Sequence, residues 1–84
     1  MPMKPSVLIV DDEKGIRESI RMILEYEGYA SAFAENGQKA IDLFGAERFD
    51  AVLLDIKMPP GKDGMEVLSE LRQMNQIVPV ICLP

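Results

Sequence analysis

Four short apolar runs recur along the chain, and the stretches between them have the periodicity of helices. The residues Val7-Leu8-Ile9-Val10 are all apolar and mostly β-branched, which is typical of a strand buried on both faces. The run Ala51-Val52-Leu53-Leu54 repeats this pattern, and a carboxylate follows each run directly. A weaker strand is predicted over residues 29–34. Another strand is predicted over residues 77–83, where Pro79 is tolerable only near the beginning of the strand or on an unpaired side.

The segment between residues 14 and 27 has the pattern of an amphipathic helix. Apolar residues recur there at positions i, i+4, i+7 and i+8, and Gly28 stands where a helix commonly ends. Arg17 is expected on the polar side of this helix, with Glu18, Arg21 and Glu25. The residues expected on the buried side are Ile16, Ile20, Ile23 and Leu24.

Two further helices are predicted. One covers residues 38–44, after a turn or helix start at Asn36-Gly37, and Gly45 is expected to end it. The other covers residues 65–74. It follows a loop at residues 57–64 that contains two prolines and two glycines. The apolar positions are Ala40, Ile41 and Phe44 in the first of these helices, and Met65, Leu68, Leu71 and Met74 in the second.

Strands and helices therefore alternate in the order βαβαβαβ. This order favours a parallel sheet with right-handed crossovers and with helices on both faces. The predicted fold class is α/β with a doubly wound parallel sheet, and a chain of 84 residues makes one small domain at most.

Composition excludes several classes of function. Nine Lys and Arg residues face fourteen Asp and Glu residues, which gives a formal net charge of −5. Because the basic residues are scattered from Lys4 to Arg72, a nucleic-acid-binding surface is not expected. No apolar run approaches the ~20 residues that cross a bilayer, and Met1-Pro2 has the character of an authentic start without a signal peptide. We expect a soluble, cytoplasmic protein.

Cysteine usage agrees with that compartment. Cys82 is the single cysteine and the chain contains no histidine, so neither an internal disulfide nor a zinc site is expected. Cys82 itself is expected to be a small buried hydrophobe.

Three carboxylates stand where two predicted strands end. Asp11 and Asp12 follow the first strand and Asp55 follows the third, and binding crevices of parallel sheets lie beyond these carboxyl ends. If the two strands are neighbours, the three like charges raise one another's pKa unless a cation neutralises them. Oxygen ligands with room for water suit Mg²⁺. An acidic pair at a helix N-terminus and a solvated strand end are the simpler interpretations.

A carboxylate beside Mg²⁺ can attack a phosphoryl donor. Asp55 is the better candidate, because it stands alone at its strand end and precedes the Pro/Gly loop. Asp11 and Asp12 form an adjacent pair better suited to holding the metal and its waters.

At these residues the sequence resembles the response regulator receiver domain of two-component signalling. The resemblance rests on Val7-Leu8-Ile9-Val10-Asp11-Asp12-Glu13, on Asp50 to Pro59, on Asp63-Gly64 and on Val78-Pro79-Val80-Ile81. It implies a flavodoxin-like fold and a signalling module rather than a turnover enzyme. It also implies that Asp55 accepts a phosphoryl group from a sensor histidine kinase, that Asp11 and Asp12 organise Mg²⁺, and that the backbone carbonyl of Lys57 is a further ligand.

The resemblance has two departures. The loop from Met58 to Gly64 is one residue longer than usual, and Pro84 stands where the family has a Thr or Ser that contacts the phosphoryl group. Residues 1–84 are therefore expected to form a partial receiver domain that lacks the last helix, strand and helix.

An apolar fourth strand with an open edge would seek a partner. The second functional hypothesis is thus a receiver fragment that mainly self-associates, as a dimer or by domain swapping. A phosphohydrolase with an aspartyl-phosphate intermediate is disfavoured, because Asp55-Ile56-Lys57 does not place two acids two residues apart.

Overall fold

A computed structural model describes residues 4–55 and 64–83 of the chain. Its strands are β1 (Ser6–Val10), β2 (Ala30–Ala34), β3 (Ala51–Asp55) and β4 (Val80–Leu83). Its helices are α1 (Lys14–Tyr26), α2 (Gly37–Ala46) and α3 (Gly64–Met74). The predicted order of strands and helices is confirmed, with boundaries that shift by one to three residues. The predicted loop at residues 57–64 lies almost wholly outside the described residues.

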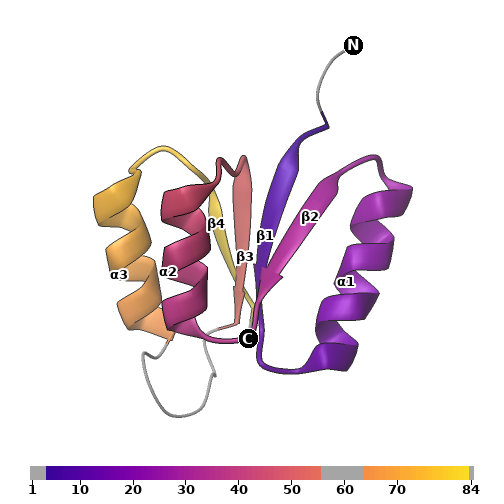
Figure 1. Ribbon diagram of the computed structural model, residues 1–84, viewed down its shortest axis with the longest axis horizontal. Helices are drawn as coiled ribbons and strands as arrows, with labels where there is room; N and C mark the ends of the chain where they lie inside the picture. Colours follow the sequence, from indigo (N-terminus) through magenta and orange to yellow (C-terminus); the bar gives the residue numbers. More distant parts are fainter. Residues whose placement is uncertain (1–3, 56–63, 84) are drawn as a thin grey trace.

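The strands form one parallel sheet in the order β2-β1-β3-β4. Figure 1 shows α1 on one side of this sheet and α2 and α3 together on the other, so the doubly wound α/β class is confirmed. The central pair is β1 and β3, with Val10 opposite Leu54. In the described part of the chain β2 and β4 form the two edges of the sheet.

The main core lies between the sheet and the pair α2 and α3. Alternate residues of the central strands point into it, and Leu8 and Leu54 are fully buried there. Val67 and Leu71 of α3 face the same core, whereas Met65 and Met74 are exposed. The prediction for α3 was therefore right in part: Leu71 is buried and Leu68 packs against the core, but Val67 is buried in place of the two methionines.

The prediction for the buried side of α1 was wrong in part. Ile16 is 43% exposed and Ile23 is 63% exposed, while Arg17, expected on the polar side, is only 8% exposed. The reason is where the helix lies: α1 contacts β1 and β2, so only the side of the helix that faces these two strands is covered. Ile20 and Leu24 lie on that side and are half-buried.

Gly45 does not end the second helix, which continues to Ala46. A Cβ atom at Gly45 would lie 3.2 Å from the terminal methyl carbon of Met74, so this glycine allows close packing of α2 against α3. Gly28 does follow α1, and its φ of 89° is a conformation that other residues rarely adopt. Asn36 begins α2 with a side-chain oxygen that accepts from the backbone N–H of Lys39 at 2.8 Å.

Cys82 is exposed on β4, contrary to the prediction that it is buried. The edge position of β4 explains this, since β3 is its pairing partner in the described residues. No helix in the described residues is long and apolar enough to span a membrane.

Candidate functional site

The pairing of β1 with β3 brings the predicted carboxylates together. Asp11 follows Val10, and Asp55 follows Leu54, the residue opposite Val10 in the ladder. One carboxylate oxygen from each of Asp11, Asp12 and Asp55 lies within 4.8 Å of the other two. The convergence expected from the two strand ends is therefore confirmed.

Backbone hydrogen bonds fix the segment that carries two of these acids. The N–H of Asp11 donates to the carbonyl of Ala34 on β2 at 3.1 Å. The Oδ1 atom of Asp11 accepts from the N–H of Glu13 at 2.9 Å, which closes a tight turn before α1. The Asp11 side chain thus lies inward while Asp12 is exposed and Asp55 is half-buried.

Burial is the main cause of an abnormal titration at Asp11, which is 5% exposed. Desolvation raises the pKa of Asp11 above the ordinary value, and the hydrogen bond from Glu13 opposes this increase. The charges of Asp55 and Asp12 raise the pKa further, by smaller amounts. Like-charge repulsion, which the sequence suggested as the cause, is therefore secondary to desolvation.

Arg17 belongs to this site, and the sequence pattern alone did not identify it. Its Nη1 atom donates to the backbone carbonyl of Asp11 at 2.7 Å, and its guanidinium carbon lies 5.4 Å from the centre of the Phe33 ring. The signal that could have found it was spacing: residues 17, 20 and 24 fall at i, i+3 and i+7, on the side of α1 that faces the sheet.

Two predicted features of the site lie outside the described residues. They are Lys57, expected to offer its backbone carbonyl, and Pro84, the position without a hydroxyl.

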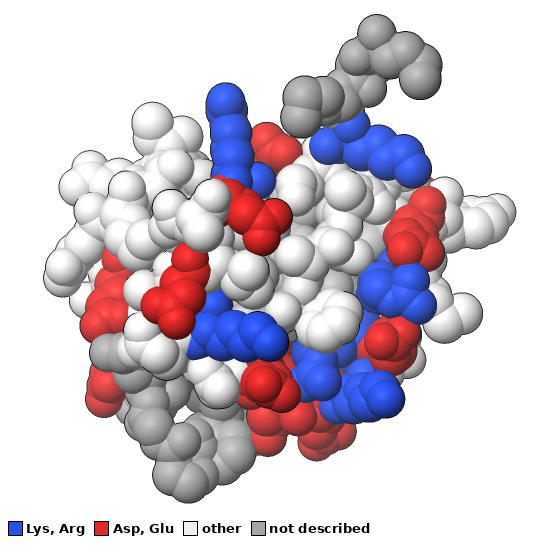
Figure 2. Space-filling model, viewed as in Figure 1, with Lys and Arg blue, Asp and Glu red and all other residues white. Residues whose placement is uncertain are grey.

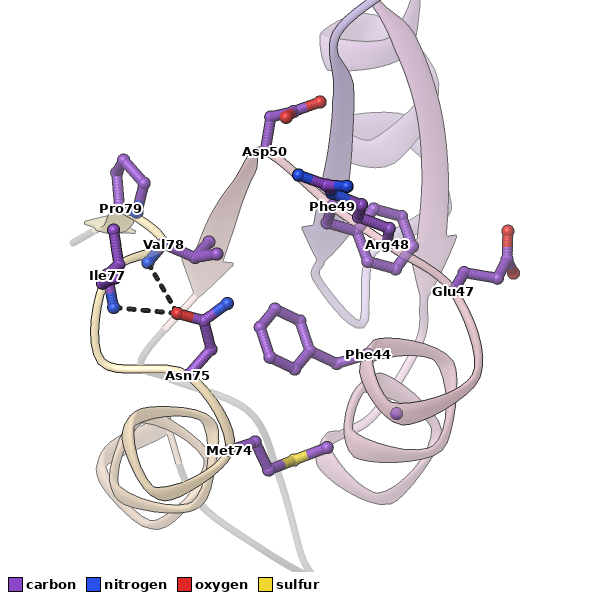
Figure 3. A pocket seen from close by; sticks show the side chains of 11 residues that line it. Phe44, Glu47, Arg48, Phe49, Asp50, Met74, Asn75, Ile77, Val78 and Pro79 are labelled. Carbon is purple, nitrogen blue, oxygen red and sulfur yellow. Dashed lines mark hydrogen bonds between the residues drawn. The ribbon is translucent and has the colours of Figure 1, made fainter.

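A separate hollow of about 580 Å³ lies at the other end of the sheet, where β3 and β4 begin. Figure 3 shows it between the last turns of α2 and α3, with Phe44, Phe49 and Met74 around it. The side-chain oxygen of Asn75 accepts from the N–H groups of Ile77 and Val78 at 2.8 and 3.2 Å and shapes one wall. None of the three clustered carboxylates lines this hollow.

Charges of both signs are interspersed on the face that Figure 2 shows, which matches the scatter of basic residues along the sequence. Arg21 of α1, for example, pairs with Glu18 at 2.9 Å and with Glu25 at 2.8 Å.

A model of the response regulator receiver domain matches residues 7–84 of the chain. The chain belongs to this family. Receiver domains are signalling modules of two-component response regulators, and the α/β fold with four parallel strands agrees with the flavodoxin-like receiver fold that the sequence predicted.

Two curated relatives and two solved structures place this receiver domain among its neighbours. The response regulator MprA of Mycolicibacterium vanbaalenii is 41% identical over 83 residues, which are 99% of this chain and 35% of the relative. MprA of Mycobacterium avium is 39% identical over 77 residues, which are 92% of this chain and 33% of the relative. The chain thus spans about a third of the length of these relatives.

The solved structures share the arrangement of strands and helices. The response regulator TrrA of Thermotoga maritima, solved in complex with Mg²⁺-BeF, is 42% identical with a TM-score of 0.88. The chemotaxis protein CheY4 of Vibrio cholerae is 28% identical with a TM-score of 0.90. Each match covers 95% of this chain and 68% of the solved chain.

Proposed function

We propose that this receiver domain accepts a phosphoryl group on Asp55 from a sensor histidine kinase in the cytoplasm. Asp11, Asp12, Asp55 and the backbone carbonyl of Lys57 would hold the Mg²⁺ ion that the transfer needs. The observation that carries the proposal is the cluster of three carboxylates within 4.8 Å at the carboxyl ends of β1 and β3. The similarity to TrrA, whose structure is a complex with Mg²⁺-BeF, supports it.

The donor set fits a hard divalent cation. Carboxylate oxygens are the ligands that Mg²⁺ prefers, and one or two of them suffice because the ion keeps several waters. Asp11 is buried with a raised pKa, so a nearby cation would stabilise its ionised form. When bound, Mg²⁺ neutralises the negative charge that gathers on the transferring phosphoryl oxygens.

Accessibility distinguishes Asp55 from Asp11 as the nucleophile. Asp11 is buried, and its Oδ1 atom already accepts a hydrogen bond from Glu13. Asp55 is half-buried at the end of β3. In the proposed step, a carboxylate oxygen of Asp55 forms a bond to phosphorus while the bond from phosphorus to the donor imidazole nitrogen breaks. The imidazole leaves with that electron pair and takes up a proton, and an acyl phosphate remains on Asp55.

The test uses intact-mass measurement after incubation with acetyl phosphate, a small donor in which an acetate oxygen is the leaving atom. We expect one phosphoryl adduct that requires Mg²⁺ and disappears in Asp55→Asn. The matched control is Asp50→Asn at the opposite end of the same strand, where the side chain accepts from the N–H of Ser6 at 2.7 Å. An adduct that persists in Asp55→Asn, or no adduct on the folded wild-type chain, would contradict the proposal.

A second proposal concerns the chain of 84 residues in isolation, which we infer to pair with a second copy through β4. In the described residues β4 is an edge strand, and Ile81 and Cys82 on it are exposed. Edge strands present N–H and C=O groups that can continue a sheet. Light scattering under reducing conditions should show a mass that rises with concentration. Ile81→Lys should reduce this rise, whereas Ile77→Lys, outside the strand, should not. A monomer at all concentrations would contradict the inference.

A further inference from the structure

Arg17 is a buried cation next to the acidic cluster. It is 8% exposed, although it belongs to a helix in which the preceding residue, Ile16, is 43% exposed. Arginine is among the residues least often buried, because removing a guanidinium from water is costly unless hydrogen bonds and charges compensate. The cost of burying Arg17 against the sheet must therefore be compensated by its contacts.

The contacts of Arg17 are directed at one peptide group and one ring. Nη1 donates to the backbone carbonyl of Asp11 at 2.7 Å, and the guanidinium lies over Phe33 of β2 with its carbon 5.4 Å from the ring centre. Nε is buried and has no hydrogen-bond partner among the described residues. Arg17 thus gives up part of its hydrogen-bonding capacity to hold a single carbonyl.

That carbonyl has a particular place in the site. The C=O of Asp11 and the N–H of Asp12 belong to the same planar peptide group. The two aspartate side chains are attached to the Cα atoms on either side of it. The chain before this peptide is fixed by the bond from the N–H of Asp11 to Ala34, and the turn after it by the bond from Glu13 to Asp11 Oδ1. The rotation of the Asp11–Asp12 peptide plane remains free, and the hydrogen bond from Arg17 restrains it.

We propose that Arg17 is a positioning residue for the metal: it orients the Asp11–Asp12 peptide so that both carboxylates face Asp55, without contacting the ion. This inference rests on the proposed function, since it assumes that the three carboxylates bind Mg²⁺. Residues that orient the ligands of a metal commonly change its affinity by about 10- to 100-fold when they are replaced.

The test measures the dissociation constant of Mg²⁺ by calorimetry on the folded chain, for Arg17→Lys and Arg17→Met. We expect both variants to bind Mg²⁺ about tenfold more weakly than wild type. The matched controls are Arg21→Lys and Arg21→Met, one turn later on α1, where the guanidinium pairs with Glu18 and Glu25 on the helix surface. These controls should leave the dissociation constant unchanged.

The variants separate positioning from charge and from stability. If Arg17 acted only as a nearby positive charge, Arg17→Met would tighten Mg²⁺ binding, because less positive charge would oppose the ion. If Arg17 only stabilised the fold, its replacement would lower the urea midpoint and leave the affinity of the folded chain unchanged. Either result would overturn the proposal.

Phe33→Leu provides a second route, should the Arg17 variants fail to fold. It removes the ring under the guanidinium at a position that is itself 41% exposed. We expect Mg²⁺ affinity to fall about threefold, the size of a partly exposed cation–π contact, and an unchanged affinity would overturn the proposal. Absence of Mg²⁺ binding by the wild-type chain would instead reject the metal site itself, so the two failures are distinguishable.

Discussion

Val10 of β1 lies opposite Leu54 of β3 in a parallel register, so the residues that follow them, Asp11 and Asp55, lie at the same end of the sheet. The carboxyl ends of parallel strands lie at the same end of a sheet. A one-residue slip in the pairing of β1 with β3 would turn the two aspartate side chains to opposite faces. The register of the central strand pair therefore determines whether the acidic site exists, and the site in turn affects the stability of the chain.

Replacing Asp11 by Asn should stabilise the metal-free chain at neutral pH. The pKa of Asp11 is raised above its unfolded value of 3.8, so the folded state binds this proton more tightly than the unfolded state does. The free energy of unfolding therefore falls as the pH rises from 3.8 through the folded pKa, and ionised Asp11 remains destabilising at higher pH. Asn removes this penalty, and its Oδ1 can still accept from Glu13.

Urea unfolding in EDTA checks this prediction. The midpoint of Asp11→Asn should exceed that of wild type at pH 7, and the difference should shrink toward pH values at which both forms are neutral. Asp50→Asn serves as the control at the far end of β3. A lower midpoint for Asp11→Asn at pH 7 would reject the explanation.

Mg²⁺ should stabilise the wild-type chain by mass action. A ligand that binds only the folded state at 100 times its dissociation constant adds about 2.7 kcal/mol to the free energy of unfolding. Urea unfolding at increasing Mg²⁺ should show this gain for wild type and for Asp50→Asn. Asp11→Asn and Asp55→Asn should lose most of it, and an equal gain in all four proteins would place the ion elsewhere.

Asn36→Ala should destabilise the fold by about 1 kcal/mol. The side chain of Asn36 accepts from the N–H of Lys39 at 2.8 Å, one of the helical donors without a partner inside α2. Thermal unfolding measures the loss. Asn36→Asp, which retains an acceptor, should remain close to wild type, whereas equal losses in both variants would show that the cap is not the cause.

Gly28 and Gly15 should respond to alanine in opposite directions. Gly28 has a φ of 89°, and a left-handed conformation costs a residue with a Cβ roughly 1–2 kcal/mol. Gly15 lies in α1, and a Cβ atom added there would meet no described atom within 4 Å outside its own helix turn. Alanine at Gly15 should stabilise the helix by up to about 1 kcal/mol. Chemical unfolding of the two variants measures both effects, and a stabilised Gly28→Ala would contradict the first.

The central strands could be predicted well because their sequences leave little choice. Residues 7–10 and 51–54 are continuous apolar runs, which are typical of the central strands of a parallel sheet. Residues 7–10 are all buried as predicted, whereas buried and half-buried residues alternate in β3. The carboxylates that directly follow these runs then had to lie at the same end of the sheet. The acidic cluster was therefore accessible to sequence reasoning once the two strands were taken as neighbours.

Tertiary packing decided what periodicity left open. The pattern of α1 permits several apolar sides, and only the position of the helix over β1 and β2 exposes Ile16 and Ile23 and buries Arg17. Gly45 looked like a helix end, but its role is to admit Met74. Cys82 looked apolar and internal, yet its strand lies at an edge of the described sheet.

The strands that meet at the acidic cluster are neighbours in space but not in the chain, where α1, β2 and α2 separate β1 from β3. No single hairpin or helix contains the site. Long-range parallel pairing forms slowly compared with helices and local turns. Uptake of Mg²⁺ during refolding should therefore follow closure of the central strand pair, and its time course would report when the sheet assembles.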